Sequence, residues 1–320
     1  MIYHKSPLFI IILRKKIKLV VKMKILDVHH HFFSKNSVDA IKKRITPEEE
    51  EEYKKTNPED YEKFMNIKEP IARAEDLIDD MKKHAIDYIL PMSGNDEGTT
   101  IFDIHKKFPD KFPGVIPFLN PELHKEPNIM EDWIKKGAVS VKLYPSQWKK
   151  FTLQSEVLLP YFKKMVELNI NPIIHAGVVK GGDSTYWPVN PIKIKPWLIH
   201  KDLKDLKFVF AHFGAGYLRE ILMMAYANKK RILVDTSGSN DWIEWSPWDN
   251  LTQVFEKTIR ALSSSNILFG TDSNIEMLRE DVILRQKGIL QDLVTRKVIN
   301  QEDREKILFT NTVELFNIKL

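Results

Sequence analysis

The chain has 320 residues, of which 43% are hydrophobic and 29% are charged, as is usual for a globular protein. It contains no cysteine, which excludes disulfide bonds, thiolate metal sites and cysteine nucleophiles. Seven of the 49 basic residues lie within residues 1–24, which hold no acidic residue. The rest of the chain holds the other 42 basic residues and all 44 acidic residues, so its net charge is slightly negative. This composition does not support a basic groove for nucleic acid.

The first 22 residues are a basic extension around a short apolar run at residues 8–13. This run is far shorter than the roughly 20 residues that a membrane-spanning helix needs, and no small-residue cleavage site follows it. Three interpretations stay open: a strand or hairpin at residues 8–13 and 17–21, a weak membrane-surface patch, or a segment upstream of a true start at Met23. We favour the hairpin or the upstream start.

Residues 25–33 read Ile-Leu-Asp-Val-His-His-His-Phe-Phe, and their apolar first half predicts a buried strand. Because alternate side chains of a strand share a face, His29 and His31 point to one side together with Asp27. Two imidazoles at one strand end are half of a metal site. His30 faces the other way, where packing or hydrogen bonding is its expected role. Asp27 either orients a ligand imidazole or satisfies a buried backbone group.

Charged residues from Lys35 to about Pro70 predict one or two solvated helices inserted after this strand, as surface filler or as a lid over a site. Beyond them, apolar strands alternate with amphipathic helices. The predicted strands lie at residues 88–92, 114–119, 139–144, 171–175, 208–212, 232–236 and 267–272. The predicted helices lie at residues 73–84, 100–108, 129–136, 158–168, 197–206, 217–227, 251–262 and 277–318, with a Gly-, Pro- and Trp-rich loop at 177–196.

The pattern therefore holds eight strands, each followed by helix. Alternating βα units predict a parallel sheet, and eight of them predict a closed (β/α)8 TIM barrel, in an α/β fold with a helical insertion after strand 1. A doubly wound open sheet is the alternative. We expect residues 23–320 to form the barrel domain, with its insertion at about 35–70 and residues 1–22 as an extension.

Polar side chains close the predicted strands, where a TIM barrel carries its chemistry. Four of the ten histidines stand at such ends, and Asp272 ends the last strand. These four histidines are His29, His31, His175 and His212. Four imidazoles and a carboxylate at one barrel mouth predict a divalent metal site. The remaining histidines of the charged helical stretches are expected at the surface; they are His84, His105 and His200.

At these positions the sequence resembles the amidohydrolase superfamily, in the amidohydrolase-related branch that includes aminocarboxymuconate-semialdehyde decarboxylase-like enzymes. The resemblance covers residues 23–320 and rests on an ordered set of short motifs. They are Asp27-x-His29-x-His31, Lys142-Leu-Tyr-Pro, Ile174-His175-Ala-Gly177, Ala211-His212-Phe-Gly214, Gly270-Thr-Asp272 and Asn311-Thr-Val-Glu-Leu-Phe316. By this resemblance one divalent metal is bound by His29, His31, His175 and Asp272, and His212 contacts substrate or bound water.

Nitrogen and carboxylate ligands of this kind suit Zn²⁺, with Mn²⁺ or Fe²⁺ as alternatives. A metal site with an open position lowers the pKa of its water to about 7. Asp272 is placed to accept the proton of that water as a general base. His212 is placed to polarise a carbonyl group or to hold an oxyanion.

Lys142 has three open roles, because a lysine in a barrel mouth is costly to bury unpaired. By the resemblance to binuclear relatives, it is a carbamate that bridges two metals, with His175 and His212 on the second ion. It otherwise contacts a substrate carboxylate or, less favoured, forms a structural salt bridge. One ion is expected, or two if Lys142 is carbamylated. Tyr144 and Trp187 are candidates to line the pocket, although packing is the commoner role of such aromatic residues.

We expect a metal-dependent hydrolase that acts on a C–N or C–O bond of a small, carboxylated, cyclic or aromatic substrate. The same residues also suit a non-oxidative decarboxylase of an unsaturated or aromatic acid, and a non-catalytic binding protein is a third, less favoured reading. The expected partner is a small-molecule substrate, without nucleic acid or stable membrane association, in a cytoplasmic protein. The family resemblance is compatible with a homodimer.

Overall fold

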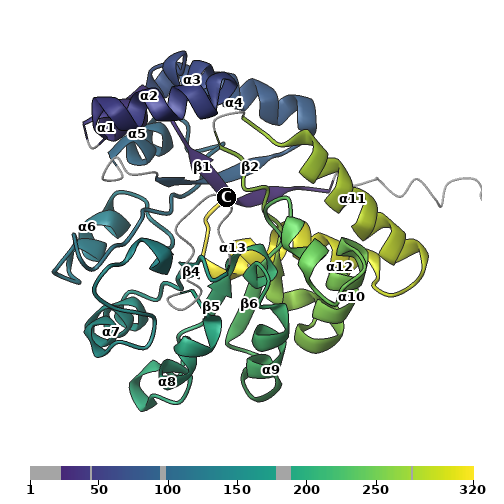
Figure 1. Ribbon diagram of the computed structural model, residues 1–320. Helices are drawn as coiled ribbons and strands as arrows, with labels where there is room; N and C mark the ends of the chain where they lie inside the picture. Colours follow the sequence, from purple (N-terminus) through teal and green to yellow (C-terminus); the bar gives the residue numbers. More distant parts are fainter. Residues whose placement is uncertain (1–22, 44, 94–98, 178–188, 275–276) are drawn as a thin grey trace, which may run out of the picture.

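The computed structural model describes residues 23–320 except 44, 94–98, 178–188 and 275–276 (Figure 1). Its strands are β1 (Leu26–Phe32), β2 (Tyr88–Ser93), β3 (Lys142–Leu143), β4 (Ile173–Ile174), β5 (Phe208–Phe210), β6 (Ile232–Asp235) and β7 (Ile267–Leu268). β1 pairs with β2, and β3 to β7 form a five-stranded sheet in chain order. Every pairing between these strands is parallel, as the alternation of strands and helices predicts.

Single bridges connect the two sheets on both sides. The segment at residues 115–118 runs between β2 and β3, because Met92 bridges to Ile116 and Phe118 bridges to Lys142. On the other side, His30 of β1 bridges to Ser273. Eight parallel segments of the described chain therefore follow one another around a common axis. The fold is the predicted α/β TIM-barrel type, with short strands in place of long ladders.

The strand predicted at residues 114–119 is wrong as a continuous strand, because only isolated bridges form there. Pro113 and Pro117 flank or interrupt it, and proline has no amide hydrogen for a sheet ladder. The amide of Ile116 still donates a hydrogen bond of 2.9 Å to the Pro91 carbonyl. This segment thus holds its position in the barrel through single hydrogen bonds.

Beyond β1 and its insertion, helices alternate with the strands along the chain, and the last three follow β7. They are α4 (Pro70–His84), α5 (Thr99–Lys107), α6 (Ile129–Lys135), α7 (Leu159–Glu167), α8 (Lys195–Leu198), α9 (Leu218–Asn228), α10 (Leu251–Leu262), α11 (Glu280–Thr295), α12 (Gln301–Glu305) and α13 (Asn311–Leu315). The helix predicted at 197–206 is broken instead. His200 is extended and its imidazole accepts a hydrogen bond from the Asp202 amide, which starts a separate 3₁₀ turn.

The insertion after β1 holds three helices rather than the one or two expected: α1 (Lys35–Lys42), α2 (Pro47–Thr56) and α3 (Pro58–Met65). α2 begins with a capping box, in which the Thr46 hydroxyl and the Glu49 carboxylate each accept the other residue's amide. Proline at the first position starts α2 and α3. None of the ten residues of α2 is buried, so this helix is solvated, as its charge pattern indicates.

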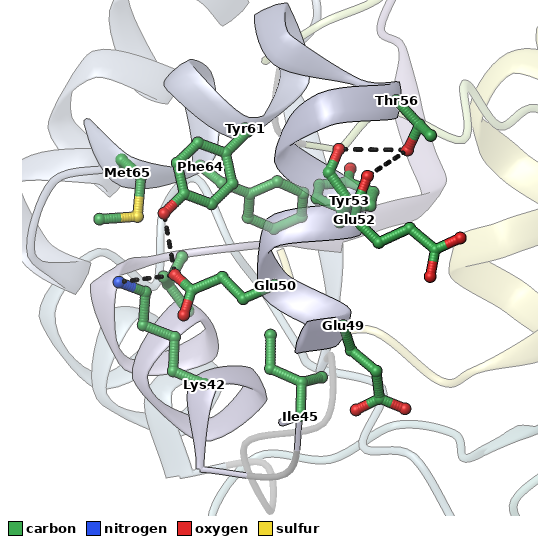
Figure 2. Close-up of a pocket in the computed structure, with 11 residues that line it drawn as sticks. Lys42, Ile45, Glu49, Glu50, Glu52, Tyr53, Thr56, Tyr61, Phe64 and Met65 are labelled. Atoms are coloured by element: carbon green, nitrogen blue, oxygen red, sulfur yellow. Dashed lines mark hydrogen bonds and ion pairs between the residues drawn. The ribbon is translucent and has the colours of Figure 1, made fainter. Parts of the chain in front are cut away.

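The insertion contains a cavity of about 580 Å³ between its helices (Figure 2). Aromatic and apolar side chains of Tyr53, Phe64 and Met65 form part of its wall. The Glu50 carboxylate accepts a hydrogen bond of 2.8 Å from the Tyr61 hydroxyl beside it. Within the described part of the chain, the cavity wall includes none of the histidines predicted to bind metal.

The barrel interior is filled by apolar side chains below the polar strand ends. Leu26 and Val28 of β1 belong to this cluster, and Phe316 and Ile318 pack into it from the chain end. Figure 1 shows the C-terminus at the centre of the barrel. Among the described residues no helix is long and apolar enough to cross a lipid bilayer. The packed centre leaves the polar mouth as the place for chemistry.

Candidate metal centre

Three of the predicted ligands meet at the mouth. His29 Nε2 and His31 Nε2 lie 3.2 Å apart. Oδ1 of Asp272 lies 3.5 Å from the former and 3.4 Å from the latter. The His29 side chain is buried, whereas His31 and Asp272 are 23% and 28% exposed. The three ligand atoms therefore converge on one point that solvent reaches from one side, as a divalent cation requires.

Asp27 fixes the backbone beneath these ligands. Its Oδ1 accepts hydrogen bonds of 3.0 Å from the amides of His29 and Thr271, and its Oδ2 accepts one from the Thr271 hydroxyl. Of its two expected roles, the structure thus shows the backbone role. The Asp272 amide in turn donates to the His29 carbonyl at 2.8 Å. These bonds hold the two ligand-bearing segments in register.

The carboxylate that orients the His29 ring is Asp235 at the end of β6, which the sequence analysis missed. Its Oδ2 accepts a hydrogen bond of 2.8 Å from His29 Nδ1. Its Oδ1 accepts from the amides of His212 and Ser237 at 2.9 and 3.1 Å. Asp235 is completely buried. The signal that could have found it is an acid closing a predicted strand, the pattern that singled out Asp272.

His212 lies beside His29, and His175 lies beside His212. His212 Nε2 lies 3.2 Å from His175 Nδ1, and the His212 ring also packs against the His29 ring with 4.8 Å between centroids. His175 is not within the compact group of ligand atoms formed by His29, His31 and Asp272. Its buried Nε2 has no hydrogen-bond partner in the part of the chain that the structure describes. A buried ring nitrogen in this state suits a metal ligand.

Lys142 reaches the same centre from β3. Its Nζ lies 3.1 Å from His29 Nε2, and the residue is only 2% exposed. Burial lowers the pKa of the Lys142 ammonium to about 8. Tyr144 stands beside it, with its ring 4.5 Å from the His175 ring and its pKa raised by burial to about 12. Trp187 lies outside the described residues.

The ligand groups carry the protonation states that a metal needs. Burial lowers the pKa of His29 to about 3 and holds the pKa of His175 well below its ordinary value, so that both rings are neutral. Burial opposes ionisation of Asp272, but the nearby His212 and the hydrogen bond from His31 hold its pKa well below its ordinary value. Neutral imidazoles and a carboxylate are the ligand forms of these side chains. The residues present therefore fit a divalent cation.

The predictions for two other histidines, His30 and His84, had different outcomes. His30 is buried, as expected, and its Nδ1 has no partner among the residues that the structure describes. The surface position predicted for His84 is wrong, because this residue is buried and its Nε2 lies 3.3 Å from Asp80 Oδ1. Its position seven residues after Leu77 and three after Met81 puts it on the inward face of α4.

Solved structures of similar fold span nearly the whole chain. 5-Carboxyvanillate decarboxylase from Sphingomonas paucimobilis has a TM-score of 0.66 at 12% identity, covering 93% of this chain and 100% of that one. 4-Oxalomesaconate hydratase from Rhodopseudomonas palustris has a TM-score of 0.60 at 18% identity, with 92% and 95% covered. Dihydroxybenzoic acid decarboxylase from Polaromonas sp. JS666, with bound manganese and the inhibitor 2-nitroresorcinol, has a TM-score of 0.60 at 15% identity, with 92% and 97% covered.

At these identities, the structural similarity shows the fold alone. A search of curated proteins finds no match. The sequence model of the amidohydrolase family matches residues 26–318, a range that includes both histidines of β1, the buried Asp235 and the strand-end Asp272. The chain belongs to the amidohydrolase family.

Proposed function

We propose that this protein is a metal-dependent hydrolase that cleaves a C–N or C–O bond of a small, carboxylated, cyclic or aromatic compound. The observation that supports it is the convergence of His29 Nε2, His31 Nε2 and Asp272 Oδ1 at a partly exposed point of the barrel mouth. His29, His31, His175 and Asp272 would hold the cation. When bound, a divalent cation supplies Lewis-acid activation of water or of a substrate carbonyl.

The chain's own groups divide the remaining work. Asp272 is ionised and 28% exposed, so its carboxylate can accept the proton of an attacking water as a general base. Lys142 is an ammonium below pH 8 and can hold a substrate carboxylate beside the cluster. Tyr144 offers an aromatic wall next to His175 for a planar substrate. Trp187 keeps its proposed place in the pocket lining.

Non-oxidative decarboxylation of an aromatic or unsaturated acid is the second candidate. Two of the similar structures are decarboxylases of aromatic acids, and the Lys142 charge suits a carboxylated substrate. A decarboxylase must deliver a proton to the ring carbon that loses CO₂. The lowered pKa of Asp272 keeps its carboxylate ionised, the form that can accept a proton, whereas the proton donor of a decarboxylase must itself be protonated.

Product analysis in isotopically labelled water separates the two reactions. We expect purified enzyme, given a panel of lactones, amides and aromatic acids in H₂¹⁸O, to incorporate one ¹⁸O atom per bond cleaved and to release no CO₂. The label enters because the attacking oxygen of a hydrolase comes from water. Release of CO₂ without ¹⁸O in the product would contradict the hydrolase proposal and support the decarboxylase.

Metal content gives a second, independent check. We expect purified protein to hold one equivalent of a divalent metal, Zn²⁺ in first place and Mn²⁺ or Fe²⁺ as alternatives. A chelator should abolish activity and the added metal should restore it, which elemental analysis and kinetics measure together. Two equivalents would support a carbamylated Lys142 that bridges two ions. A fully active enzyme free of bound metal would refute the proposed centre.

The remaining proposals concern the surroundings of the site. We propose a small-molecule substrate, no nucleic-acid partner and no stable membrane association, in a cytoplasmic protein; a homodimer is compatible with the family resemblance. The slight negative charge of the chain beyond residue 24 supports the exclusion of nucleic acid. We also propose that residues 23–320 form the catalytic domain and that residues 1–22 are not needed for it, which removal of that segment would test.

A further inference from the structure

One buried carboxylate contacts two of the four histidines at the mouth. Both oxygens of Asp235 are surrounded by hydrogen-bond donors: the His29 ring on one oxygen, and the amides of His212 and Ser237 on the other. The Ser237 hydroxyl also contacts Asp235 Oδ1. An ionised carboxylate only accepts hydrogen bonds, so each of these partners must donate. The hydroxyl hydrogen of Ser237 is thereby committed to Asp235.

The His29 ring is defined from both ends. Nδ1 faces the Asp235 carboxylate at 2.8 Å and therefore carries the proton. Nε2 faces the Lys142 ammonium at 3.1 Å, a group with three hydrogens to donate and no acceptor. Both contacts call for the same neutral tautomer. Nε2 is thus the unprotonated nitrogen of the ring, and it lies 3.2 Å from His31 Nε2 and 3.5 Å from Asp272 Oδ1.

The His212 ring is defined through Ser237. Because the Ser237 hydroxyl donates to Asp235, its oxygen can only accept from His212 Nδ1, which lies 2.8 Å away. The other atom near His212 Nδ1 is the Ser237 carbonyl oxygen at 3.2 Å, also an acceptor. Within the described residues, both groups that bond to His212 Nδ1 therefore require a proton there. In the uncharged ring, Nε2 then holds the lone pair.

The same logic passes to His175. Its Nδ1 lies 3.2 Å from His212 Nε2, which accepts, so His175 Nδ1 must carry the proton and donate. The lone pair of the neutral His175 ring then lies on Nε2. That atom is buried and has no hydrogen-bond partner in the described chain. The tautomer of His175 that follows from the contacts of Asp235, Ser237 and His212 is therefore the one that can bind a metal through Nε2.

We propose that Asp235 and Ser237 are positioning residues that fix the Nδ1-protonated tautomer of His29, His212 and His175, and so keep the Nε2 lone pairs of His29 and His175 available to a divalent metal. The inference rests on the proposed function in one respect, the binding of a metal by those two nitrogens. It gives His212 a supporting role between Ser237 and His175, instead of the oxyanion-binding role expected from sequence. Glycine at position 270 leaves room for His29 and Ser237 on either side of it. A Cβ atom there would lie 2.9 Å from His29 Cβ and 3.0 Å from Ser237 Cβ.

The first test reads the tautomers directly in metal-free, full-length protein. Ring nitrogens with and without a proton have distinct ¹⁵N resonances, so protein labelled with ¹⁵N-histidine reports the proton position in each ring. His29, His175 and His212 are expected in the Nδ1-protonated form, with each signal assigned by its loss in a single His→Gln variant. A proton on Nε2 of His29 or His175, or a doubly protonated His212, would overturn the proposal.

The second test uses Asp235→Asn, which is nearly isosteric. In either orientation of the asparagine amide, its NH₂ group takes the place of a carboxylate oxygen that accepts hydrogen bonds. It then faces either the His29 ring or the amides of His212 and Ser237, which are all donors. Loss of such an outer partner typically lowers metal affinity by about 10- to 100-fold. Calorimetric titration of metal-free protein with Zn²⁺ is expected to show that decrease, together with a change of the His29 tautomer.

Asp27→Asn is the matched control. Asp27 is equally buried and accepts from two amides and a hydroxyl, but these partners are the His29 and Thr271 backbones and the Thr271 side chain, not an imidazole ring. This variant is expected to keep the three tautomers, because no imidazole ring contacts Asp27, even where the altered backbone contacts lower the Zn²⁺ affinity. The same tautomer change in both variants would overturn the proposal, since any buried carboxylate would then serve. Failure of the proposed hydrolysis would appear instead as intact tautomers and Zn²⁺ binding without ¹⁸O incorporation.

Discussion

The Asp272→Asn variant is expected to lose on the order of 10³-fold in kcat/KM, within the range that removal of a general base costs. The carboxylate lies 3.4 to 3.5 Å from both imidazoles of β1 and is ionised. An amide cannot take up the proton of a water molecule, and it is a weaker ligand for a divalent cation. Both losses act on the same step, so most of the effect should appear in kcat.

The fold should survive this substitution. Asp272 has a φ of 58°, in the left-handed region where asparagine is among the best tolerated residues other than glycine. Its amide hydrogen bond to the His29 carbonyl, 2.8 Å long, belongs to the backbone and is unaffected. The side-chain oxygen of asparagine can still accept the hydrogen bond that His31 donates to this position. Circular dichroism and thermal unfolding should therefore match the unmodified protein.

The control for this variant is Asp281→Asn on α11. Asp281 is 61% exposed and pairs with Arg285 at 3.1 Å, so its loss should cost little stability and leave kcat/KM unchanged. Steady-state kinetics on the substrate found by the labelled-water assay measure both variants. If Asp272→Asn kept more than roughly a tenth of the activity, Asp272 would not be the general base.

The fold could be predicted because its signals are local. Apolar runs and amphipathic periods mark most elements: α10, for example, has the predicted bounds of residues 251 and 262. Deviations came from single residues with special backbone chemistry. Prolines reduced the segment at 114–119 to isolated bridges, and the extended backbone of His200 ended α8 early. Such effects depend on whether a residue's backbone makes helix or strand hydrogen bonds or other local hydrogen bonds, and the period of apolar residues does not show this.

The candidate site was predictable as far as strand ends could define it. His29 and His31 follow from the two-residue period of β1, and Asp272 from its place after β7. The role of Asp235 beside His29 did not follow. Its place at a strand end marks it as a candidate, but its contact is with a ring 206 residues away in the chain. That contact depends on the order of strands around the barrel, not on spacing along the chain.

The second large effect concerns Lys142, whose replacement by methionine is expected to stabilise the metal-free protein while it lowers kcat/KM. Burial lowers the pKa of this ammonium from 10.5 to about 8. Each pKa unit corresponds to about 1.4 kcal/mol, so the charged lysine costs the folded state about 3 kcal/mol at neutral pH. Methionine is unbranched, apolar and of similar length, and can fill the same space.

The sign of the effect depends on pH. Between pH 8 and 10.5 the unfolded chain binds a proton on Lys142 that the folded chain does not bind, so the stability of the unmodified protein rises through this window. The cost is fully present below pH 8 and absent above 10.5. The stability difference between Lys142→Met and unmodified protein should therefore be about 3 kcal/mol at pH 7 and fall toward zero near pH 10.5. Urea unfolding at several pH values measures it.

Activity should change in the opposite direction. If Lys142 holds a substrate carboxylate, loss of that charge-assisted contact should lower kcat/KM by about 10- to 100-fold, mainly through KM. Lys207→Met is the control, because Lys207 is exposed and should change neither stability nor activity.

A stability difference that stays constant from pH 7 to 10.5 would contradict the buried ammonium as its cause. A Lys142→Met protein less stable than the unmodified one would contradict a net cost of burying this lysine, and together with two bound metal equivalents it would favour a carbamate at this position. The buried lysine thus links the stability of the barrel to its chemistry: the charge that the fold disfavours is the one that the proposed substrate requires.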